Sequence, residues 1–170
     1  MKPADAAKAI TQGTRRKIGR DRRAILATAH FGAELVAQNA PVDRGAIKAS
    51  AHVEDDGETV RIVFDAPHTG IVELGSRPHV PPLGPLIAWV KRHRAAFGIA
   101  GKGTARNKAT GRFEASAEVV RIARAIQQKI KREGTKPTYF IRRSIPAITD
   151  QLKRELVRAA AEGAGKKTRR

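Results

Sequence analysis

Cysteine is absent from the 170 residues of this chain, and several other features are scarce. Without cysteine there are no disulfides, thiolate metal sites or cysteine nucleophiles. One Trp, one Tyr and five Phe predict a core that is mainly aliphatic. No apolar run approaches the roughly 18 residues of a membrane span, and the polar start Met1–Asp5 lacks the apolar core of a signal peptide. We therefore expect a soluble protein made in the cytoplasm, with no membrane partner.

Acidic residues are also scarce relative to basic ones, at 16 Asp and Glu against 34 Lys and Arg, for a formal charge of +18. Such an excess implies a polyanionic partner, acidic neighbours in an assembly, or both. The basic residues expected to face a partner or DNA are Arg15, Arg16, Lys17, Arg20, Lys102, Arg106, Lys108, Arg112, Lys166 and Lys167. Sequence-specific DNA readout is not expected, because neither a helix-turn-helix pairing nor interleaved aromatics accompany them.

The first half of the chain predicts a helix followed by strands. Residues 1–20 form a basic arm, and apolar spacings of three and four predict an amphipathic helix from Asp21 to Asn39. Alternation predicts antiparallel strands over 47–54 and 59–65, joined by a turn at Asp55–Gly57. A third strand is predicted over 71–74.

The second half predicts helices around a basic loop. Pro85 opens and Gly98 closes a short helix, and residues 98–112 read as a mobile basic loop. Ser116 caps a helix that stops at Gly134, and a final helix follows Pro146.

These elements predict an α+β fold: a small antiparallel sheet of three or four strands packed on the N-terminal helix, with two or three further helices in the C-terminal half. We expect one domain over residues 21–162, followed by a basic tail over 163–170.

The stretch Ala66–Pro82 is the most unusual part of the sequence. Its predicted strand ends abruptly at Gly75 and Pro81, which favours an extended, stiff segment on the surface. Alternation places Glu73 opposite Val72 and Leu74, on an exposed face, where it is a candidate contact to a basic partner surface.

Catalytic and metal motifs are weak. The glycine-rich segment at Gly98–Thr104 is two residues short of a phosphate loop, the histidines form no HExxH pattern, and the serines lie outside a nucleophile elbow. Acidic residues that could in principle form a Mg²⁺ nuclease site are Asp43, Asp55, Asp56, Asp65 and Glu73. Asp55 and Asp56 lie at a predicted turn, where aspartate is common because its side chain hydrogen-bonds the nearby backbone. We therefore expect no enzyme activity, metal or cofactor.

Three segments carry a family resemblance. They are A-P-V-D-R-G-A-I-K-A-S at 40–50, A-P-H-T-G-I-V-E-L-G-S at 66–76, and K-P-T-Y-F-I-R-R-S-I-P-A at 136–147. Their order resembles the minor tail component or neck proteins of tailed phages, the gene product ten family of HK-type coliphages. The motif positions are Pro41, Asp43, Gly45, Ser50, Pro67, Glu73, Gly75 and Pro81. Departures from the family pattern include Arg44 for the usual Thr and His68 for the usual Tyr.

This resemblance implies a non-enzymatic virion protein, assembled in the host cytoplasm, that forms a ring in the head-tail neck as a tail-completion or terminator-type subunit. Its implied partners are copies of itself, as a hexamer by preference and a dodecamer second, together with other neck, connector and tail-tube proteins. Genomic DNA in the channel is a further possible contact. The alternatives are a basic DNA-binding or condensing protein and, more remotely, a metal-dependent nuclease.

Overall fold

The computed structural model describes residues 3–106 and 113–165, and their contacts divide the chain into two compact units. Unit 1 contains the described residues up to Glu73 together with those from Thr138 onward. Unit 2 is Leu74–Pro137. One domain is predicted from the sequence over residues 21–162. The contacts instead group Leu74–Pro137 into a separate compact unit.

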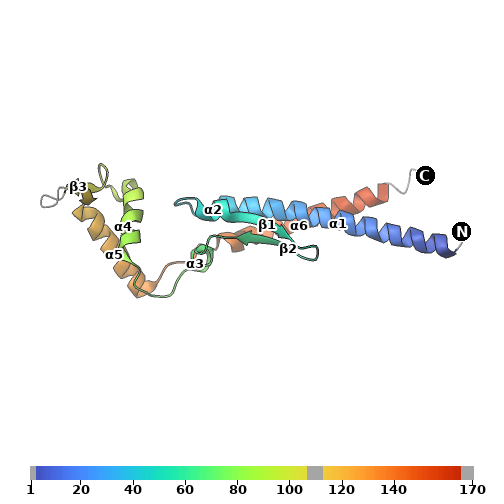
Figure 1. Cartoon of the computed structure of the whole chain (residues 1–170), viewed down its shortest axis with the longest axis horizontal. Helices are drawn as coiled ribbons and strands as arrows, with labels where there is room; N and C mark the ends of the chain where they lie inside the picture. Colours follow the sequence, from blue (N-terminus) through green and yellow to red (C-terminus); the bar gives the residue numbers. More distant parts are fainter. Residues whose placement is uncertain (1–2, 107–112, 166–170) are drawn as a thin grey trace. The chain divides into compact units, whose positions relative to one another are not determined.

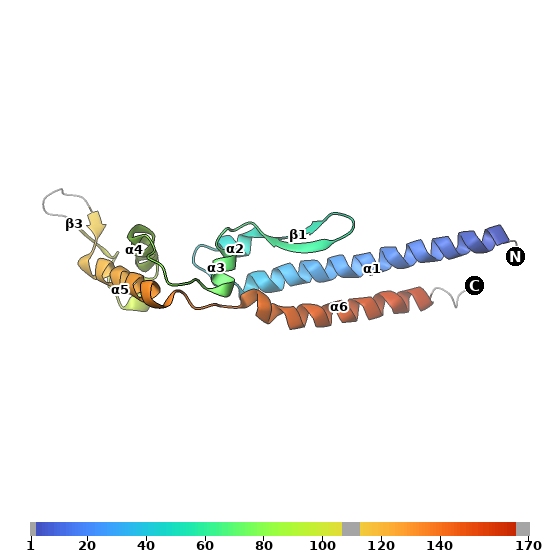
Figure 2. The ribbon, with the colours of Figure 1, turned by 90° about the horizontal axis from the view of Figure 1, so that it is seen from below.

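Unit 1 is built on two long helices, α1 (Pro3–Asn39) and α6 (Phe140–Gly165), which lie side by side (Figures 1 and 2). Between them in sequence come α2 (Ala46–Ser50), β1 (Ala51–Asp55), β2 (Val60–Phe64) and α3 (Thr69–Leu74). β1 and β2 pair antiparallel, with Val53 opposite Ile62, and the hairpin packs on α1. The hairpin turn predicted at Asp55–Gly57 is confirmed.

The α1 helix begins far earlier than predicted. The predicted arm, residues 1–20, is helical from Pro3 and continuous with the helix that was expected to start at Asp21. Gly13 and Gly19 do not break it, because a glycine inside a helix costs only about 1 kcal/mol relative to alanine. α6 packs against the later part of α1, where residues 19–22 are half-buried and Ala24 is buried, whereas residues 11–18 are exposed.

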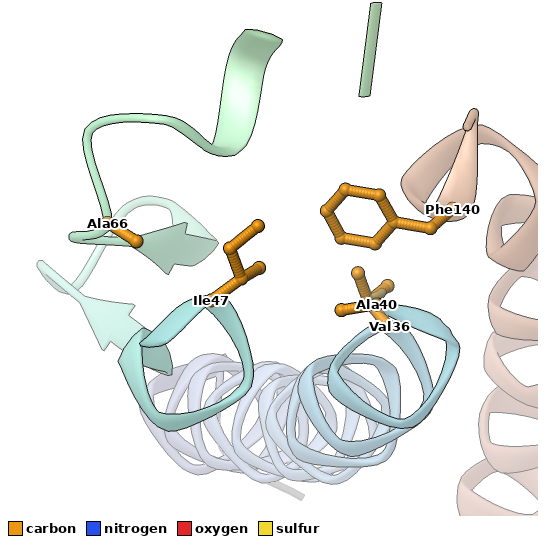
Figure 3. Packing of buried hydrophobic residues seen from close by; sticks show 5 residues of the cluster. All are labelled: Val36, Ala40, Ile47, Ala66 and Phe140. Atoms are coloured by element: carbon orange, nitrogen blue, oxygen red, sulfur yellow. The ribbon is translucent and has the colours of Figure 1, made fainter. Parts of the chain in front are cut away.

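The core of unit 1 gathers where α1 ends and α6 begins (Figure 3). Val36 and Phe140 are each 1% exposed, and Ile47 of α2 points toward them. The rings of Phe64 and Phe140 meet edge to face, with their centroids 6.3 Å apart. The cluster consists of Val36, Ala40, Ile47, Ala66 and Phe140.

Unit 2 contains α4 (Leu83–Arg92), the 3₁₀ helix η1 (Arg94–Phe97), β3 (Thr104–Arg106), β4 (Phe113–Ala115) and α5 (Ala117–Glu133). α4 packs on α5 around Val90, Ile99, Val119 and Ala123. The predicted helix end at Gly134 is confirmed, since this glycine follows α5 with positive φ. The helix predicted to close at Gly98 ends earlier: α4 stops at Arg92, and Gly98, also with positive φ, closes η1. The loop predicted over 98–112 contains strand β3, and its residues 107–112 lie outside the described residues.

The α+β class is confirmed, but the strand predicted at 71–74 is wrong. The described strands form two separate two-stranded hairpins, and residues 69–74 form helix α3. Thr69 starts the helix by donating both its hydroxyl and its amide to the carbonyl of Ala66, at 2.7 and 3.0 Å. This local bonding by Thr69 outcompetes the strand preference of Ile71 and Val72.

The strand predicted over 47–54 and the helix predicted after Pro146 are also shifted. Residues 46–50 form α2, so the strand begins only at Ala51. α6 starts at Phe140, six residues before Pro146, and continues through that proline. A proline inside a helix removes one hydrogen bond, so the turn before Pro146 needs support from elsewhere.

Candidate interaction surfaces

The start of α6 is held by a buried carboxylate from a distant part of the sequence. Glu73 is only 8% exposed, and its two oxygens accept hydrogen bonds from the amides of Ile141 at 2.9 Å and Arg142 at 3.0 Å. The first amides of any helix lack intrahelical partners, and the helix dipole makes that end positive. Glu73 therefore satisfies two of these amides with the charge that a helix N-terminus favours.

The end of α3 and the residues before α6 complete this junction. The amides of Thr138 and Tyr139 donate to the carbonyls of Val72 at 3.2 Å and Glu73 at 3.1 Å. The Thr138 hydroxyl adds a bond of 2.8 Å to the Val72 carbonyl. The last carbonyls of α3, which lack intrahelical partners, thus accept from the two amides just before α6, so α3 fixes where α6 begins.

This junction also holds a strained residue. Tyr139 has φ of +52°, which is uncommon for a residue other than glycine. Its amide is bound to Glu73 and its carbonyl accepts from Arg143 at 2.9 Å. The surrounding hydrogen bonds stabilise a backbone conformation that is unfavourable for an isolated tyrosine.

The predictions for Glu73 are therefore wrong. It was expected on an exposed strand face and as a contact to a basic partner, whereas it is buried and both oxygens are used within unit 1. The missed signal is the spacing of Thr69 and Glu73, four residues apart and both buried on one side of α3. Four-residue spacing is typical of a helix. Because both residues are polar, however, the spacing suggests an exposed helix face and not a buried one.

The other motif positions shape turns. Gly45 precedes α2 with φ of +77°, and the Ser50 hydroxyl donates to the carbonyl of Ile47 at 3.0 Å. Gly75 has φ of +75°, and a Cβ there would lie 2.3 Å from the carbonyl oxygen of Thr135, so only glycine fits. Exposed motif residues are Pro41, Asp43 and Pro67, and Pro81 is half-buried and accepts a hydrogen bond from Gln127.

Several large apolar side chains remain exposed in unit 1 and on α3. Ile71 and Leu74 of α3 are 56% and 68% exposed, and Val42, after α1, is 67% exposed. Isolated exposed apolar residues are normal on a monomer. Here Ile71 and Leu74 both lie in the second motif, three residues apart on one short helix.

A basic groove runs between the N-terminal half of α1 and the C-terminal half of α6. One hollow of about 190 Å³ is lined by Arg20, Arg23, Ala24, Ala27, Glu155, Arg158, Ala159 and Glu162. A larger, open hollow continues it along α1 and is lined by Arg15, Arg16, Gly19, Arg20, Arg23 and Glu162. Three of the ten predicted basic residues, Arg15, Arg16 and Arg20, therefore come together here. Arg23, which belongs to the same basic segment of the sequence, also lines this groove. Arg158 lines it too and was missed, because its proximity depends on the pairing of α1 with α6.

The remaining predicted basic residues do not join this groove within the described part of the chain. Lys17 is exposed on α1 and Lys102 is exposed in unit 2. Arg106 lies in β3. The predictions for Lys108, Arg112, Lys166 and Lys167 lie outside the described residues.

The acidic residues weighed as a nuclease site do not come together. Asp56 accepts from the amides of Glu58 at 3.0 Å and Thr59 at 2.7 Å, so it stabilises the hairpin turn. Asp65 lies 3.5 Å from a ring nitrogen of His52, whose pKa is raised mainly by its hydrogen bond to the Ser50 carbonyl. Within residues 3–106 and 113–165, no group of three His, Asp or Glu side chains is arranged to hold a metal ion.

Comparison with known proteins returned no match: no family model, curated protein or solved structure matches the chain at a significant level. Among the described helices, none combines the length and apolarity needed to cross a bilayer.

Proposed function

We propose that this chain is a structural, ring-forming subunit of the head-tail neck of a tailed phage, of the tail-completion or terminator type. The supporting observation is that the three motif segments, which are far apart in sequence, meet in one junction. The first contributes Ala40 and Ile47 to the core, the second Ala66, and the third Phe140 (Figure 3). Residues that carry the resemblance therefore depend on one another, as a shared fold would require.

The exposed apolar residues of α3 fit an assembly of copies of this chain. Leu74 directly follows Glu73 and Ile71 lies two residues before it, and the Glu73 carboxylate accepts from two amides of α6. α3 is therefore a rigid element that presents apolar side chains to solvent. A ring subunit needs such a surface on each copy, and closed ring symmetry repeats the same contact around the ring.

Mass photometry of the full chain, alone and with the connector and tail-tube proteins of the same phage, tests this proposal. We expect a species with the mass of a ring, a hexamer by preference and a dodecamer as the second choice. In the virion, this ring would lie in the neck. Ile71→Ser should reduce assembly, whereas Val157→Ser, at a position 70% exposed on α6 outside the motifs, should leave it unchanged. A chain that remains monomeric alone and with both partners contradicts the proposal.

A second candidate, a DNA-binding or condensing protein, is favoured by one specific observation, the arginine-lined groove of unit 1. Filter binding separates the two candidates. A condensing protein binds duplex DNA tightly, with a steep loss of affinity as salt rises, and needs no neck protein. A neck subunit assembles with protein partners and binds DNA more weakly.

A further inference from the structure

We infer that the groove between α1 and α6 is a binding site for the phosphodiester backbone of nucleic acid, with Arg20 as its central residue. This inference goes beyond the proposed neck function and does not rest on it, because it concerns side chains of a single copy of the chain. It names the residues through which the second candidate, DNA binding, would act.

The arginines of the groove are available to an external anion. Arg15, Arg16, Arg20 and Arg23 form no ion pair with any residue in the described part of the chain, whereas Arg22, between them, pairs with Asp55. The two glutamates of the groove are already engaged. Glu162 lies 3.6 Å from Nε of Arg158, and Glu155 accepts from Gln151 at 3.0 Å.

Arg20 supplies the strongest indication of a missing ligand. Its Nε is the one buried side-chain nitrogen or oxygen without a hydrogen-bond partner among the described residues. A buried donor left without an acceptor is costly, and arginine is among the most strongly donating side chains. Phosphate oxygens bound by the guanidinium of Arg20 would offset this cost.

The protein makes room for Arg20 on the facing helix. A Cβ at Gly163 of α6 would lie 2.6 Å from a terminal nitrogen of the Arg20 guanidinium and 3.0 Å from its central carbon. The absence of a side chain at Gly163 therefore allows the guanidinium to lie against α6. Its position in the groove depends on both helices.

The spacing of the arginines favours a chain of phosphates over a single anion. Arg16, Arg20 and Arg23 are separated by four and three residues, so they share one face of α1. At 1.5 Å per residue they span about 10 Å, which is roughly three phosphates of one DNA strand measured along the duplex axis. Arginine forms bidentate hydrogen bonds to phosphate, which suits backbone contacts that carry no sequence information.

The first test measures fluorescence anisotropy of a 30-base-pair duplex with the full chain over a range of salt concentrations. Replacing Arg16, Arg20 and Arg23 together by Gln should weaken binding at least about tenfold at 0.1 M salt and reduce the salt slope by about 2 to 3. The matched control replaces Arg121, Arg124 and Lys129 of α5, three exposed cations outside the groove, by Gln. Circular dichroism of each variant checks that its helices are retained.

A second variant tests the site without changing the charge. Gly163→Ala should displace the Arg20 guanidinium and reduce the salt slope by about 0.9, the value of one phosphate contact. Gly13→Ala is its control, because a Cβ at Gly13 meets nothing within 4 Å. Both changes introduce the same methyl group into a helix.

Four outcomes would overturn the inference. The first is a loss of duplex affinity in the α5 control equal to that in the groove variant, and the second is an unchanged salt slope in Gly163→Ala. The third is a groove that binds poly-glutamate in preference to the duplex, and the fourth is no duplex binding at 0.05 M salt. Mass photometry of the same variants reports ring assembly separately, so a failure of DNA binding is distinguishable from a failure of the proposed neck function.

Discussion

Two regions of unit 1 use a carboxylate in the same way and with different consequences. At the hairpin turn, Asp56 accepts from the amides of Glu58 and Thr59, two and three residues ahead of it. At the start of α6, Glu73 accepts from the amides of Ile141 and Arg142, 68 and 69 residues ahead. The first carboxylate is exposed and the second is buried.

The difference lies in what each pair of hydrogen bonds connects. Asp56 stabilises a turn that its neighbours already favour, and solvent weakens its interactions. Glu73 joins two helices that have no local reason to meet, in surroundings where its bonds are stronger and its loss leaves amides without acceptors. The same chemistry thus shapes a turn in one place and the arrangement of unit 1 in the other.

The largest effect is expected from Glu73→Ala. It leaves the amides of Ile141 and Arg142 without their acceptor, and we expect the free energy of unfolding of unit 1 to fall by about 3 kcal/mol. Urea denaturation followed by circular dichroism measures the loss, and hydrogen exchange at these two amides should accelerate. Glu34→Ala, an exposed glutamate on α1, is the control and should change stability by less than about 0.5 kcal/mol. A loss below about 1 kcal/mol in Glu73→Ala would contradict the role assigned to this carboxylate.

A smaller effect is expected from Glu73→Gln, which keeps the shape and one acceptor oxygen. It loses the charge that favours the positive end of α6, and one amide of the helix then faces an NH₂ group instead of an oxygen. We expect a loss of about 1 to 2 kcal/mol in the same urea experiment. A loss as large as that of Glu73→Ala would show that the charge, and not the acceptor geometry, dominates.

In unit 2, Ser116→Ala should cost about 0.5 to 1 kcal/mol. Ser116 caps its own helix by accepting from the amide of Val119 at 3.4 Å, a long bond that spans only three residues. Trp89 is the single tryptophan of the chain and packs in the core of unit 2, so its fluorescence reports this unit during urea denaturation. Ser116→Asp keeps an acceptor and should restore the stability. If Ser116→Ala lowers the free energy of unfolding as much as Glu73→Ala does, a cap from the same helix and a cap from a distant residue contribute equally. The distinction between local and distant carboxylate or hydroxyl contacts would then be wrong.

Local signals account for what could be predicted from the sequence. Ser116, Gly134 and the Asp55–Gly57 turn act within a few residues, and each occurs where the sequence indicates. The α+β class follows from such signals together with apolar spacing. The fold could be predicted to this extent because these interactions do not depend on the rest of the chain.

Distant partners account for what could not be predicted. The start of α6 depends on Glu73, and the arginine groove depends on both helices. The basic character of Arg15, Arg16 and Arg20 was visible in the sequence. Their meeting with Arg158 was not, because it requires the pairing of helices that are more than a hundred residues apart.

The smallest effect is expected at Asp56, and it depends on pH. The amides of Thr59 and Glu58, together with Arg61, lower the pKa of the Asp56 carboxyl from its ordinary value. A carboxyl whose pKa is lower in the folded state contributes stability above its unfolded pKa of about 3.9, and loses that contribution as pH falls through the folded value. Comparison of Asp56→Asn with the unmodified chain by urea denaturation should therefore show a difference at pH 6 that shrinks toward pH 3.

Salt and direct titration separate this exposed carboxylate from the buried one. Because Asp56 and Arg61 are exposed, raising the salt concentration should weaken the part of the stabilisation that comes from their ion pair, whereas the loss in Glu73→Ala should change little. Carbon-detected NMR titration of the Asp56 carboxyl in the Glu73→Ala variant should still give a lowered pKa, since the turn that lowers it is local. An Asp56 pKa that returns to its ordinary value in that variant would mean that the hairpin turn depends on the α6 junction, and that the two carboxylates do not act independently.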